Sequence, residues 1–399
     1  MWKYNDDGVF IDTGPEGIFW VLFNMVPGLG IRRMMSLRRF FGTLRQAWEA
    51  PASQLRMTPG IPDKVIDNII EHRSTVEIDR ELDRARNAGA RIVTLDSPSY
   101  PANLKHIHDP PPVLYIIGDL SQRDDAACAI VGTRRASPYG EGVAFRFARD
   151  LSSSGITIVS GMALGIDSAA HKGALAAGGR TVAVLGSGVD VVYPPENHDL
   201  YKEIALKGAV LSEFPMGTLP QRGNFPCRNR IISGLALACL VVEARDRSGA
   251  LVTCGFAAEQ GRPVFAVPGD IRRPQAAGPN KLIRDGASPA LDIEEIRETI
   301  EAEVGRVLRP AGPQSRTSDT KMIEKPSGPS ASMGLSGNQK LILDVLEYEP
   351  MTRDEIIERT GANASDVASV LIDLELSGII RSLPGDSFMR HEEDPFQRS

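Results

Sequence analysis

Cysteine and histidine are scarce in this chain, whose 399 residues include four cysteines and six histidines. The cysteines form no CxxC pair and have no histidine at metal-ligand spacing, which excludes a disulfide scaffold and a zinc site and fits a reducing cytoplasm. Apolar runs that approach the roughly 20 residues needed to span a bilayer are also missing. The first residues lack the basic and then apolar pattern of a secretory signal. We therefore expect a cytoplasmic protein with no metal and no membrane partner.

Two glycine-rich patterns are absent as well. The sequence contains neither the GxGxxG fingerprint of dinucleotide-binding proteins nor the GxxxxGK[ST] phosphate loop. We therefore expect no nucleotide cofactor.

Basic residues are outnumbered, with 45 Lys and Arg against 51 Asp and Glu and a net charge of −6. Because binders of polyanions usually carry a basic excess, this balance argues against nucleic acid. The charges are unevenly spread, however: acids gather at 292–303, 347–349 and 392–394, whereas none occurs between Glu213 and Glu243. The sequence therefore predicts a narrow, local groove for an anion rather than a broad basic surface.

Composition and periodicity divide the chain into four segments. The length predicts two or three domains, and 42% hydrophobic residues suffice for real cores. We predict a SAM-like or helix-hairpin-helix bundle, an extended Rossmann-like domain, a flexible linker and a winged-helix domain, at residues 1–82, 83–305, 306–336 and 337–399.

The first segment is helical, with two similar Pro-Gly breaks at 26–30 and 58–62. In such a hairpin the turn glycines let backbone N–H groups approach a phosphate at the next helix. Arginines follow the first break with no acid among them: Arg32, Arg33, Arg38, Arg39 and Arg45. They form either a solvated helix face or a weak nucleic-acid contact, and the sequence leaves both open.

The second segment alternates apolar runs with helical patterns. The predicted strands are 91–95, 113–117, 126–131, 156–160, 181–185, 209–212, 237–242 and 263–267. The predicted helices between them are 140–153, 167–177, 198–207, 229–236 and 248–260. Continuous Val, Ile, Leu and Ala runs are typical of strands buried on both faces, so we predict an α/β fold with a doubly wound, mostly parallel sheet.

Beyond a linker rich in Pro, Gly and Ser, the last segment predicts three short helices and a β-hairpin, at 338–348, 352–360, 365–376 and 379–390. This pattern is that of a winged helix. Its third helix carries acids that would repel phosphates in a major groove: Asp366, Asp373 and Glu375. We therefore favour protein interaction or regulation for this segment over DNA reading.

The sharpest motif is the turn Gly132-Thr133-Arg134, which follows the buried strand 126–131. At the carboxyl edge of a parallel sheet, this turn offers N–H groups, a hydroxyl and a guanidinium to an anion. The alternative is a tight turn with Arg134 merely on the surface.

A second motif follows the strand 156–160 and contains Gly161, Gly165, Asp167 and His171. The glycines let the backbone approach a ligand. Asp167 and His171 form either a helix-capping acid and a packed histidine or a catalytic pair. We favour the first interpretation, because no nucleophile stands at motif spacing.

A third motif surrounds Phe225 with the arginines Arg222, Arg228 and Arg230. Cationic groups for phosphates beside a ring face for bases suit single-stranded nucleic acid. The alternative is that Phe225 is a core anchor and that Arg230 pairs with Glu243 or Asp246. A fourth motif, Ser248-Gly249, opens a helix after a strand and supplies another anion-ready N-terminus.

Taken together, these segments resemble the DprA/Smf family of DNA-processing proteins. The resemblance spans about 90–290 and is carried, in order, by IVGTR, SGMALGIDSAAH, VAVLGSGVDVVYPPEN, LSEFP, FPCRNRIISG, VVEARDRSGALVTCGFAAEQGR and FAVPG. It implies a Rossmann-like domain that binds single-stranded DNA without catalysis and protects incoming DNA during natural transformation. It also implies transfer of that DNA to the RecA recombinase and a homodimer built through the Rossmann-like domain.

Carried over to this sequence, the resemblance places Arg134 on a backbone phosphate and makes Arg222 and Phe225 a basic residue and a base-contacting aromatic. Arg228 and Asn229 match the family's Arg-Asn motif, and Arg180 matches a basic position. The complete predicted set is Gly132, Thr133, Arg134, Gly161, Gly165, Arg180, Arg222, Phe225, Arg228, Asn229, Arg230 and Ser248.

The sequence leaves two alternatives to this function. Rossmann-like nucleotide phosphoribohydrolases carry a PGGxGTxxE motif with a catalytic Glu. Superposed on 248–253, that motif reads SGALVT, and the Glu position is Phe256, which disfavours hydrolysis. The second alternative is a regulatory scaffold that binds no DNA.

Overall fold

A computed structural model describes residues 11–12, 16–307, 342–343, 346, 351–360, 362–376, 380–383 and 387–390. Contacts divide the chain into two compact units, Met1–Gln314 and Ser315–Ser399. Residues 308–336 of the predicted linker 306–336, and most of the predicted helix 338–348, lie outside the described residues, whereas 306–307 end a helix (Glu294–Val307). None of the described helices is long and apolar enough to cross a membrane.

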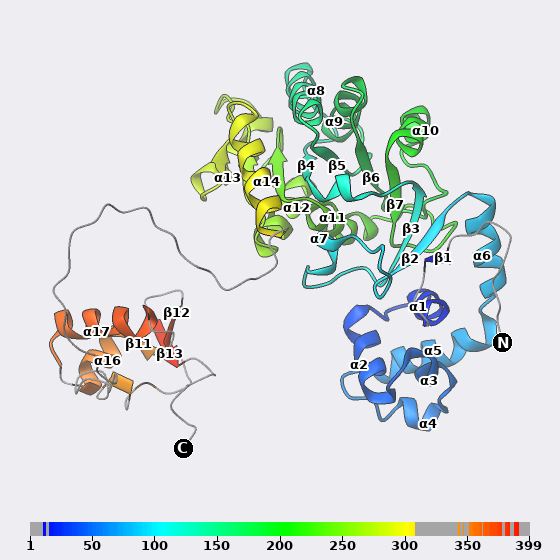
Figure 1. Ribbon diagram of the computed structural model, residues 1–399, viewed down its shortest axis with the longest axis horizontal. Coiled ribbons are helices and arrows are strands. Elements are labelled where there is room, and N and C mark those ends of the chain that lie inside the picture. The colour runs from blue at the N-terminus through cyan, green and yellow to red at the C-terminus, as the bar shows by residue number, and fades with distance from the viewer. Residues whose placement is uncertain are drawn as a thin grey trace, which may run out of the picture. The chain divides into compact units, whose positions relative to one another are not determined.

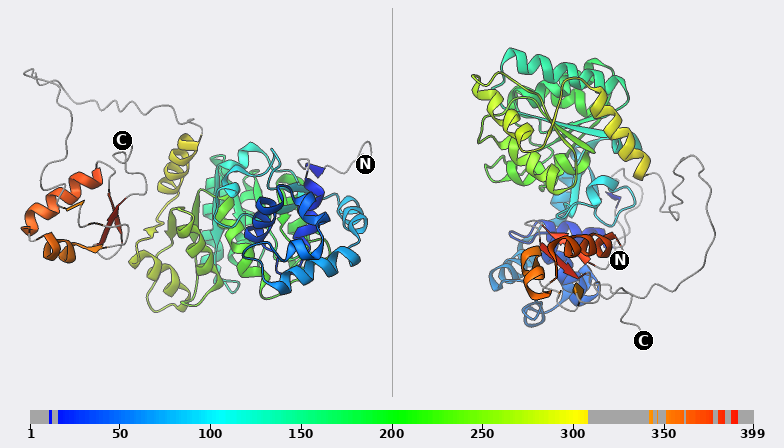
Figure 2. Two further views of the ribbon diagram at one scale, coloured as in Figure 1. Left: turned by 90° about the horizontal axis from the view of Figure 1, so that it is seen from below. Right: turned by 90° about the vertical axis from the view of Figure 1, so that its left-hand side faces the viewer.

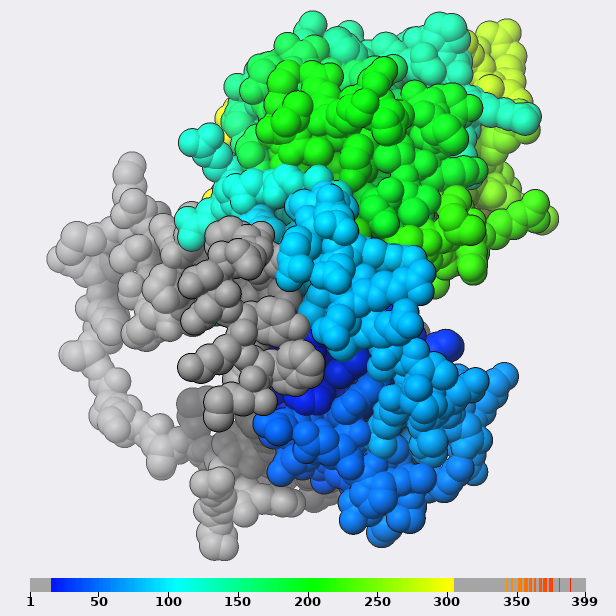
Figure 3. Space-filling model, turned by 90° about the vertical axis from the view of Figure 1, so that its right-hand side faces the viewer, coloured from blue at the N-terminus to red at the C-terminus, as the bar shows by residue number. Residues whose placement is uncertain are grey.

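The helical part of the first unit contains six short helices (Figure 1): α1 (Gly17–Asn24), α2 (Ile31–Phe41), α3 (Leu44–Glu49), α4 (Ala52–Leu55), α5 (Asp63–Thr75) and α6 (Ile78–Asn87). The two predicted Pro-Gly breaks separate α1 from α2 and α4 from α5. The predicted boundary after residue 82 falls inside α6. One hydrophobic core joins Trp20 and Phe23 of α1 to Ile92 and Tyr115 of the sheet. Figure 3 shows the surface of α1–α6 directly adjoining that of the sheet part.

Ten strands form the sheet of this unit: β1 (Ile11–Asp12), β2 (Arg91–Thr94), β3 (Val113–Gly118), β4 (Ala127–Val131), β5 (Thr157–Ser160), β6 (Thr181–Val184), β7 (Ala209–Ser212), β8 (Ala238–Val241), β9 (Val264–Ala266) and β10 (Ser288–Pro289). Their spatial order is β1-β2-β3-β7-β6-β5-β4-β8-β9-β10. From β7 to β10 every pairing is parallel, whereas β3 runs antiparallel to both of its neighbours. All eight predicted strands are present, and the doubly wound, mostly parallel fold is confirmed.

Helices cover both faces of this sheet (Figures 1 and 2). On one face lie α8 (Pro138–Ser153), α9 (Ile166–Ala176) and α10 (His198–Lys207), and on the other α11 (Asn224–Leu235) and α12 (Gly249–Glu259). Three further helices belong to this unit: α7 (Ala102–Lys105), α13 (Ala277–Arg284) and α14 (Glu294–Val307). Separate apolar clusters lie against the two faces, one with Phe147 and Leu151 of α8 and one with Ile231 and Leu235 of α11. The strands are covered on both sides, which explains why their sequences are continuously apolar and do not alternate with polar residues.

One predicted helix boundary is wrong. The helix expected to begin at Asn229 begins at Asn224, so Phe225 and Arg228 lie in the first turns of α11 and not in a loop. Pro226 is tolerated there because the first turn of a helix needs no N–H partner.

The second unit contains α16 (Arg353–Thr360), α17 (Ala364–Leu376) and a small sheet in the order β11 (Met351–Thr352), β13 (Ser387–Arg390), β12 (Ile380–Leu383). The hairpin β12–β13 is antiparallel. Its core includes Ile356, Val367, Leu371 and Phe388. This arrangement fits the predicted winged helix.

Candidate nucleic-acid interface

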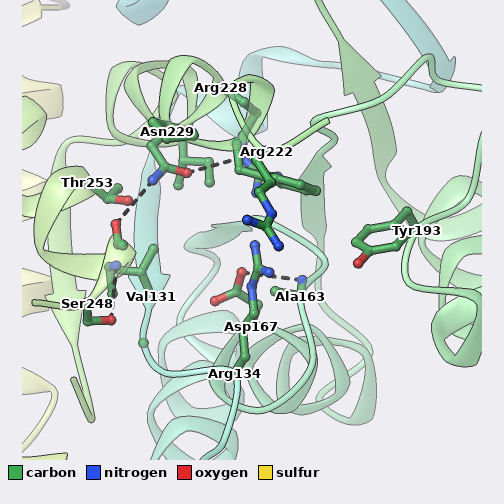
Figure 4. A pocket seen from close by; sticks show the side chains of 16 residues that line it. Val131, Arg134, Ala163, Asp167, Tyr193, Arg222, Arg228, Asn229, Ser248 and Thr253 are labelled. Carbon is green, nitrogen blue, oxygen red and sulfur yellow. Dashed lines mark hydrogen bonds between the residues drawn. The ribbon is translucent and has the colours of Figure 1, made fainter. Parts of the chain in front are cut away.

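A pocket of about 520 Å³ opens at the carboxyl ends of β4 and β8 (Figure 4). These two strands are neighbours, and the chain progresses outward from them in opposite directions, through β5 to β7 on one side and β9 to β10 on the other. This is the topological switch point, where open α/β sheets bind their ligands. The pocket is lined by Val131, Gly132, Arg134, Ala163, Asp167, Tyr193, Arg222, Phe225, Pro226, Arg228, Asn229, Ile232, Ser248, Gly249, Ala250 and Thr253.

Arg134 enters the pocket from the loop between β4 and α8. Its guanidinium carbon lies 4.9 Å from the centroid of the Phe225 ring, a cation–π arrangement. Arg134 is exposed and Phe225 is half-buried, so both remain accessible to a ligand. The predicted cation and aromatic of the first and third motifs therefore meet in one place.

Tyr193 stands opposite this pair, in the loop between β6 and α10. Its ring centroid lies 5.7 Å from that of Phe225, and 39% of its surface is exposed. Sequence reasoning missed Tyr193 as a pocket residue, although it belongs to the segment VAVLGSGVDVVYPPEN that carries the family resemblance. An aromatic after a buried strand near two glycines was the available signal.

Arg222 is the other exposed cation of the pocket and precedes α11. In the described residues no carboxylate lies within 4 Å of Arg222 or Arg134. Two unpaired guanidinium groups and two aromatic rings thus face one cavity (Figure 4). Phosphate groups and base faces are the ligand groups that this combination binds.

Arg228 was predicted to contact DNA, but the structure places its side chain inside the protein. Its side chain is buried, and its guanidinium donates to the carbonyls of Gly161, at 2.9 Å, and Val184. Burial lowers the pKa of Arg228 to about 10, and nearby Asp167 opposes that shift. Because its donors are engaged by carbonyls at the ends of β5 and β6, Arg228 braces the pocket wall and does not project into solvent.

Asp167 lies on the first turn of α9, with its carboxylate beside the Arg134 side chain (Figure 4), and Arg228 is the other cation near it. Burial raises the pKa of this carboxyl to about 6, although Arg228 and the N–H groups of Ala163 and Gly161 favour the charged form. Above that pH, Asp167 therefore supplies a negative charge near Arg134 and Arg228. It accepts a hydrogen bond from the N–H of Ala163 at 3.4 Å.

Among the described residues, His171 makes no hydrogen bond or ion pair with Asp167, as a catalytic pair would require. It is fully buried, and its Nδ1 lies 2.6 Å from the Thr181 hydroxyl. Burial lowers its pKa to about 3, so the ring is neutral at physiological pH. The packed histidine is confirmed, whereas the helix-capping role of Asp167 is wrong: Gly165 occupies the N-cap of α9 without a side-chain cap, and Asp167 accepts from the N–H of Ala163 in the preceding loop.

The predicted glycines serve close packing. A side chain at Gly132 would collide with Ile166, and one at Gly161 would come within 2.8 Å of the guanidinium of Arg228. Gly165 has a φ of +78° and lies against the Thr133 carbonyl. Protein groups thus occupy the Cβ directions of these glycines, while Gly161 also lines a small pocket with Arg134, Tyr193 and Phe225; the approach of a ligand to the backbone at Gly161 and Gly165 stays a prediction.

Thr133 is engaged by the protein through its backbone N–H. Its N–H donates to the Glu243 carbonyl at 2.7 Å, and its hydroxyl accepts from the N–H of Arg135 at 3.2 Å. The carboxylate of Glu243 in turn accepts from the hydroxyl and N–H of Ser137. Thr133 and Glu243 therefore fix the loop that carries Arg134; the N–H of Thr133 is engaged, whereas its hydroxyl only accepts in this bond and keeps its O–H to donate to an anion.

Ser248 caps α12 as expected, its hydroxyl accepting from the N–H of Ala250 at 3.3 Å. Asn229 donates to the Gly249 carbonyl at 3.2 Å and accepts from Arg228. These contacts hold the N-terminus of α12 against α11 at the edge of the pocket. Thr253, one turn into α12, completes this wall and was missed from the sequence.

Arg180 and Arg230 do not reach the pocket. Arg180 precedes β6, at the opposite edge of the sheet, where Asp124 holds it at 2.9 and 3.0 Å. Arg230 is buried and makes a two-pronged ion pair with Glu213, with both bonds at 2.6 Å. The alternative interpretation, in which Arg230 forms an ion pair, therefore holds, but the partner is Glu213 and not Glu243 or Asp246. Both arginines support the fold around the site.

In the described parts of the chain, no group of three or more His, Cys, Asp or Glu side chains is arranged to hold a metal ion. The four cysteines are free thiols. The site therefore offers cations, ring faces, backbone N–H groups and one buried carboxylate.

Comparison with known proteins agrees with this geometry. Residues 91–301 match the family model of DNA recombination-mediator protein A, and residues 326–386 match the DprA winged helix domain. Protein Smf of Synechocystis is 35% identical over 397 residues, which cover 94% of this chain and 99% of that protein.

Two solved structures are also similar. The DNA processing protein A (DprA) of Streptococcus pneumoniae is 32% identical with a TM-score of 0.62, over 72% of this chain and 97% of that chain. The DprA of Helicobacter pylori, a structure that describes a single-stranded DNA binding mode, is 31% identical with a TM-score of 0.48, over 54% of this chain and 98% of that chain.

Proposed function

The chain belongs to the DprA/Smf family of DNA-processing proteins, and on that premise we propose that it binds single-stranded DNA at the switch-point pocket without catalysis. It protects incoming DNA during natural transformation and recombination and passes the strand to the RecA recombinase. It acts as a homodimer through the Rossmann-like domain.

The cation–π pair of Arg134 and Phe225 is the observation that carries this proposal. Single-stranded nucleic acid needs a cation for each phosphate it contacts and a ring face for an unstacked base. The pocket offers both within one cavity, together with Arg222 and Tyr193. A duplex keeps its bases stacked inside, so the two rings favour single strands.

The non-catalytic character rests on the groups that face the pocket. Its carboxylate, Asp167, is buried among arginines and backbone N–H groups, and His171 is turned away toward Thr181. A hydrolase of the nucleotide phosphoribohydrolase type needs a carboxylate where this chain has Phe256. Asp167 lines the pocket with a pKa raised to about 6; we assign it an electrostatic role, and turnover of AMP would contradict that assignment.

The test is fluorescence anisotropy of the full chain with a labelled oligo-dT and with a duplex of equal length. We expect single strands to bind more tightly, and Arg134→Ala to weaken that binding. Arg146→Ala, an exposed arginine in the middle of α8, serves as the matched control. Absence of single-strand affinity at low salt would contradict the proposal, and release of ribose 5-phosphate from AMP would favour the hydrolase.

Transfer to RecA is tested separately, because DNA binding alone does not require it. Strands coated with a single-strand-binding protein are mixed with RecA, and RecA-dependent ATP hydrolysis is followed with and without this chain. We expect the chain to shorten the lag before hydrolysis. An unchanged lag would restrict the function to protection, and sedimentation of the free chain tests the dimer.

A further inference from the structure

Tyr139 and Arg273 repeat the arrangement of Phe225 and Arg134 at a second place. The Arg273 guanidinium carbon lies 5.6 Å from the centroid of the Tyr139 ring. Tyr139 is the second residue of α8 and 51% of its surface is exposed. Arg273 is exposed in the loop between β9 and α13. Neither residue lines the pocket of about 520 Å³, so the pocket does not account for them.

Hydrogen bonds place this pair on the same edge of the sheet as the pocket. The loop that carries Arg134 continues into Ser137, whose hydroxyl donates to the Glu243 carboxylate at 2.6 Å. Ala244, which follows Glu243 in the chain, donates its N–H to the Gln275 carbonyl at 2.8 Å. Three loops that follow β4, β8 and β9 are therefore fastened side by side, and Tyr139 and Arg273 stand on the first and the third.

The loop between them is basic. Arg245 and Arg247 are exposed, and in the described residues no carboxylate lies within 4 Å of either or of Arg273. The acids of these loops are engaged, since Asp246 faces Lys281 at 3.6 Å and Asp270 binds Arg272 at 2.8 Å. The path from the pocket to Tyr139 is thus lined by unpaired cations. A surface patch of one charge sign beside an exposed ring matches a phosphate backbone with unstacked bases.

We propose that Tyr139 and Arg273 form a second nucleotide-binding position, and that one DNA strand runs to it from the pocket across Arg245 and Arg247. The inference rests on the proposed single-strand binding and extends it beyond the switch point. The Tyr139 ring receives a base, and Arg273 and the two loop arginines receive phosphates. The strand therefore lies along the carboxyl edges of β4, β8 and β9.

A length series separates this second position from the pocket. Affinity of the full chain is measured for oligo-dT from about 4 to about 30 nucleotides, within and beyond the range of a single binding groove. Tyr139→Ala and Arg273→Ala are compared with the matched control Arg146→Ala. We expect both variants to bind the shortest strands like the unmodified chain and to bind long strands about tenfold more weakly.

Salt dependence and crosslinking provide independent readouts. For long strands, Arg273→Ala reduces the slope of log affinity against log salt by about 0.7, the value for one phosphate on a single strand. Oligonucleotides with one 5-iodouracil at successive positions should crosslink to Tyr139 only beyond the length that fills the pocket.

The outcomes are distinguishable. If the unmodified chain binds no single strand, the proposed function itself fails. If it binds, but Tyr139→Ala and Arg273→Ala match Arg146→Ala at every length, the second position is wrong. If the variants change the sedimentation of the free chain and not the affinity for long strands, the pair is a contact between two copies of this chain, which also overturns the inference.

Discussion

The guanidinium of Arg134 lies over the ring of Phe225, 4.9 Å from its centroid. The two residues come from elements 91 positions apart, the loop after β4 and the first turn of α11. Each orients the other, since a cation over a ring restricts both side chains. A base that stacks on Phe225 in place of the guanidinium therefore brings its phosphate close to the charge of Arg134.

Replacing Phe225 by Ala tests the ring. We expect single-strand affinity to fall by about 1–3 kcal/mol, the contribution of one stacked base, while the salt slope stays unchanged because no phosphate contact is removed. Anisotropy titrations at several salt concentrations measure both quantities. Phe225→Tyr, which keeps a ring, is the control. If the affinity of Phe225→Ala is unchanged, Phe225 serves as a core residue and the stacking role is wrong.

Replacing Arg134 or Arg222 by Ala should change the salt dependence of single-strand binding. Each substitution removes one unpaired surface cation, so we expect the salt slope on single strands to become shallower by about 0.7. Neither should change the free energy of unfolding appreciably, because both side chains are exposed. Arg146→Ala is the matched control. Equal slopes for Arg134→Ala and the control would remove Arg134 from the phosphate path.

Gly186 follows β6 and supports the Phe225 ring from behind. A Cβ at this position would lie 2.8 Å from Cδ1 of Phe225, closer than carbon atoms pack. We expect Gly186→Ala to displace the ring and to reduce single-strand affinity. In the double variant with Phe225→Ala, adding Gly186→Ala should cost no further affinity, because the ring is already absent. Additive losses would show that Gly186 acts through another contact.

The sequence predicted the sheet well because its strands are short, continuous runs rich in Val, Ile and Leu that alternate with helical patterns, which is typical of strands buried on both faces. It also placed Gly132-Thr133-Arg134 and Phe225 on one functional edge. It was wrong about which arginines reach the pocket and which form ion pairs within the protein. Arg180 pairs with Asp124, 56 residues away, and Arg230 with Glu213, 17 residues away. Such pairings depend on tertiary contacts that no local pattern reports.

The prediction of where α11 begins was wrong for a different reason. Pro226 suggests a loop when read locally, yet a helix accepts proline in its first turn. Because the helix begins at Asn224, Arg228 points inward onto the carbonyls of Gly161 and Val184. A difference of five residues in one boundary thus separates a surface phosphate contact from a buried brace.

Arg228 should therefore matter for stability more than the exposed arginines do. We expect Arg228→Met to lower the free energy of unfolding by about 3–5 kcal/mol, since it leaves the buried Asp167 carboxylate without its main counter-charge. Adding Asp167→Asn removes that charge and should restore part of the loss. Urea unfolding of the full chain measures both. A loss as small as that of Arg222→Ala would mean that Arg228 is not a brace.

Asp167 also predicts that DNA binding depends on pH. Its pKa of about 6 in the free chain means that the carboxylate is charged above that pH, where it offsets the positive charges of Arg134 and Arg228. A bound phosphate disfavours this negative charge and raises the pKa further, so binding takes up protons. Single-strand affinity should therefore rise as the pH falls from about 8 toward 6, by less than tenfold per pH unit because one group titrates. His171, with a pKa of about 3, stays neutral throughout this range, and Arg228, with a pKa of about 10, stays charged. Asp167→Asn should bind with a flat pH profile, and an unaltered slope in that variant would assign the titration to another group.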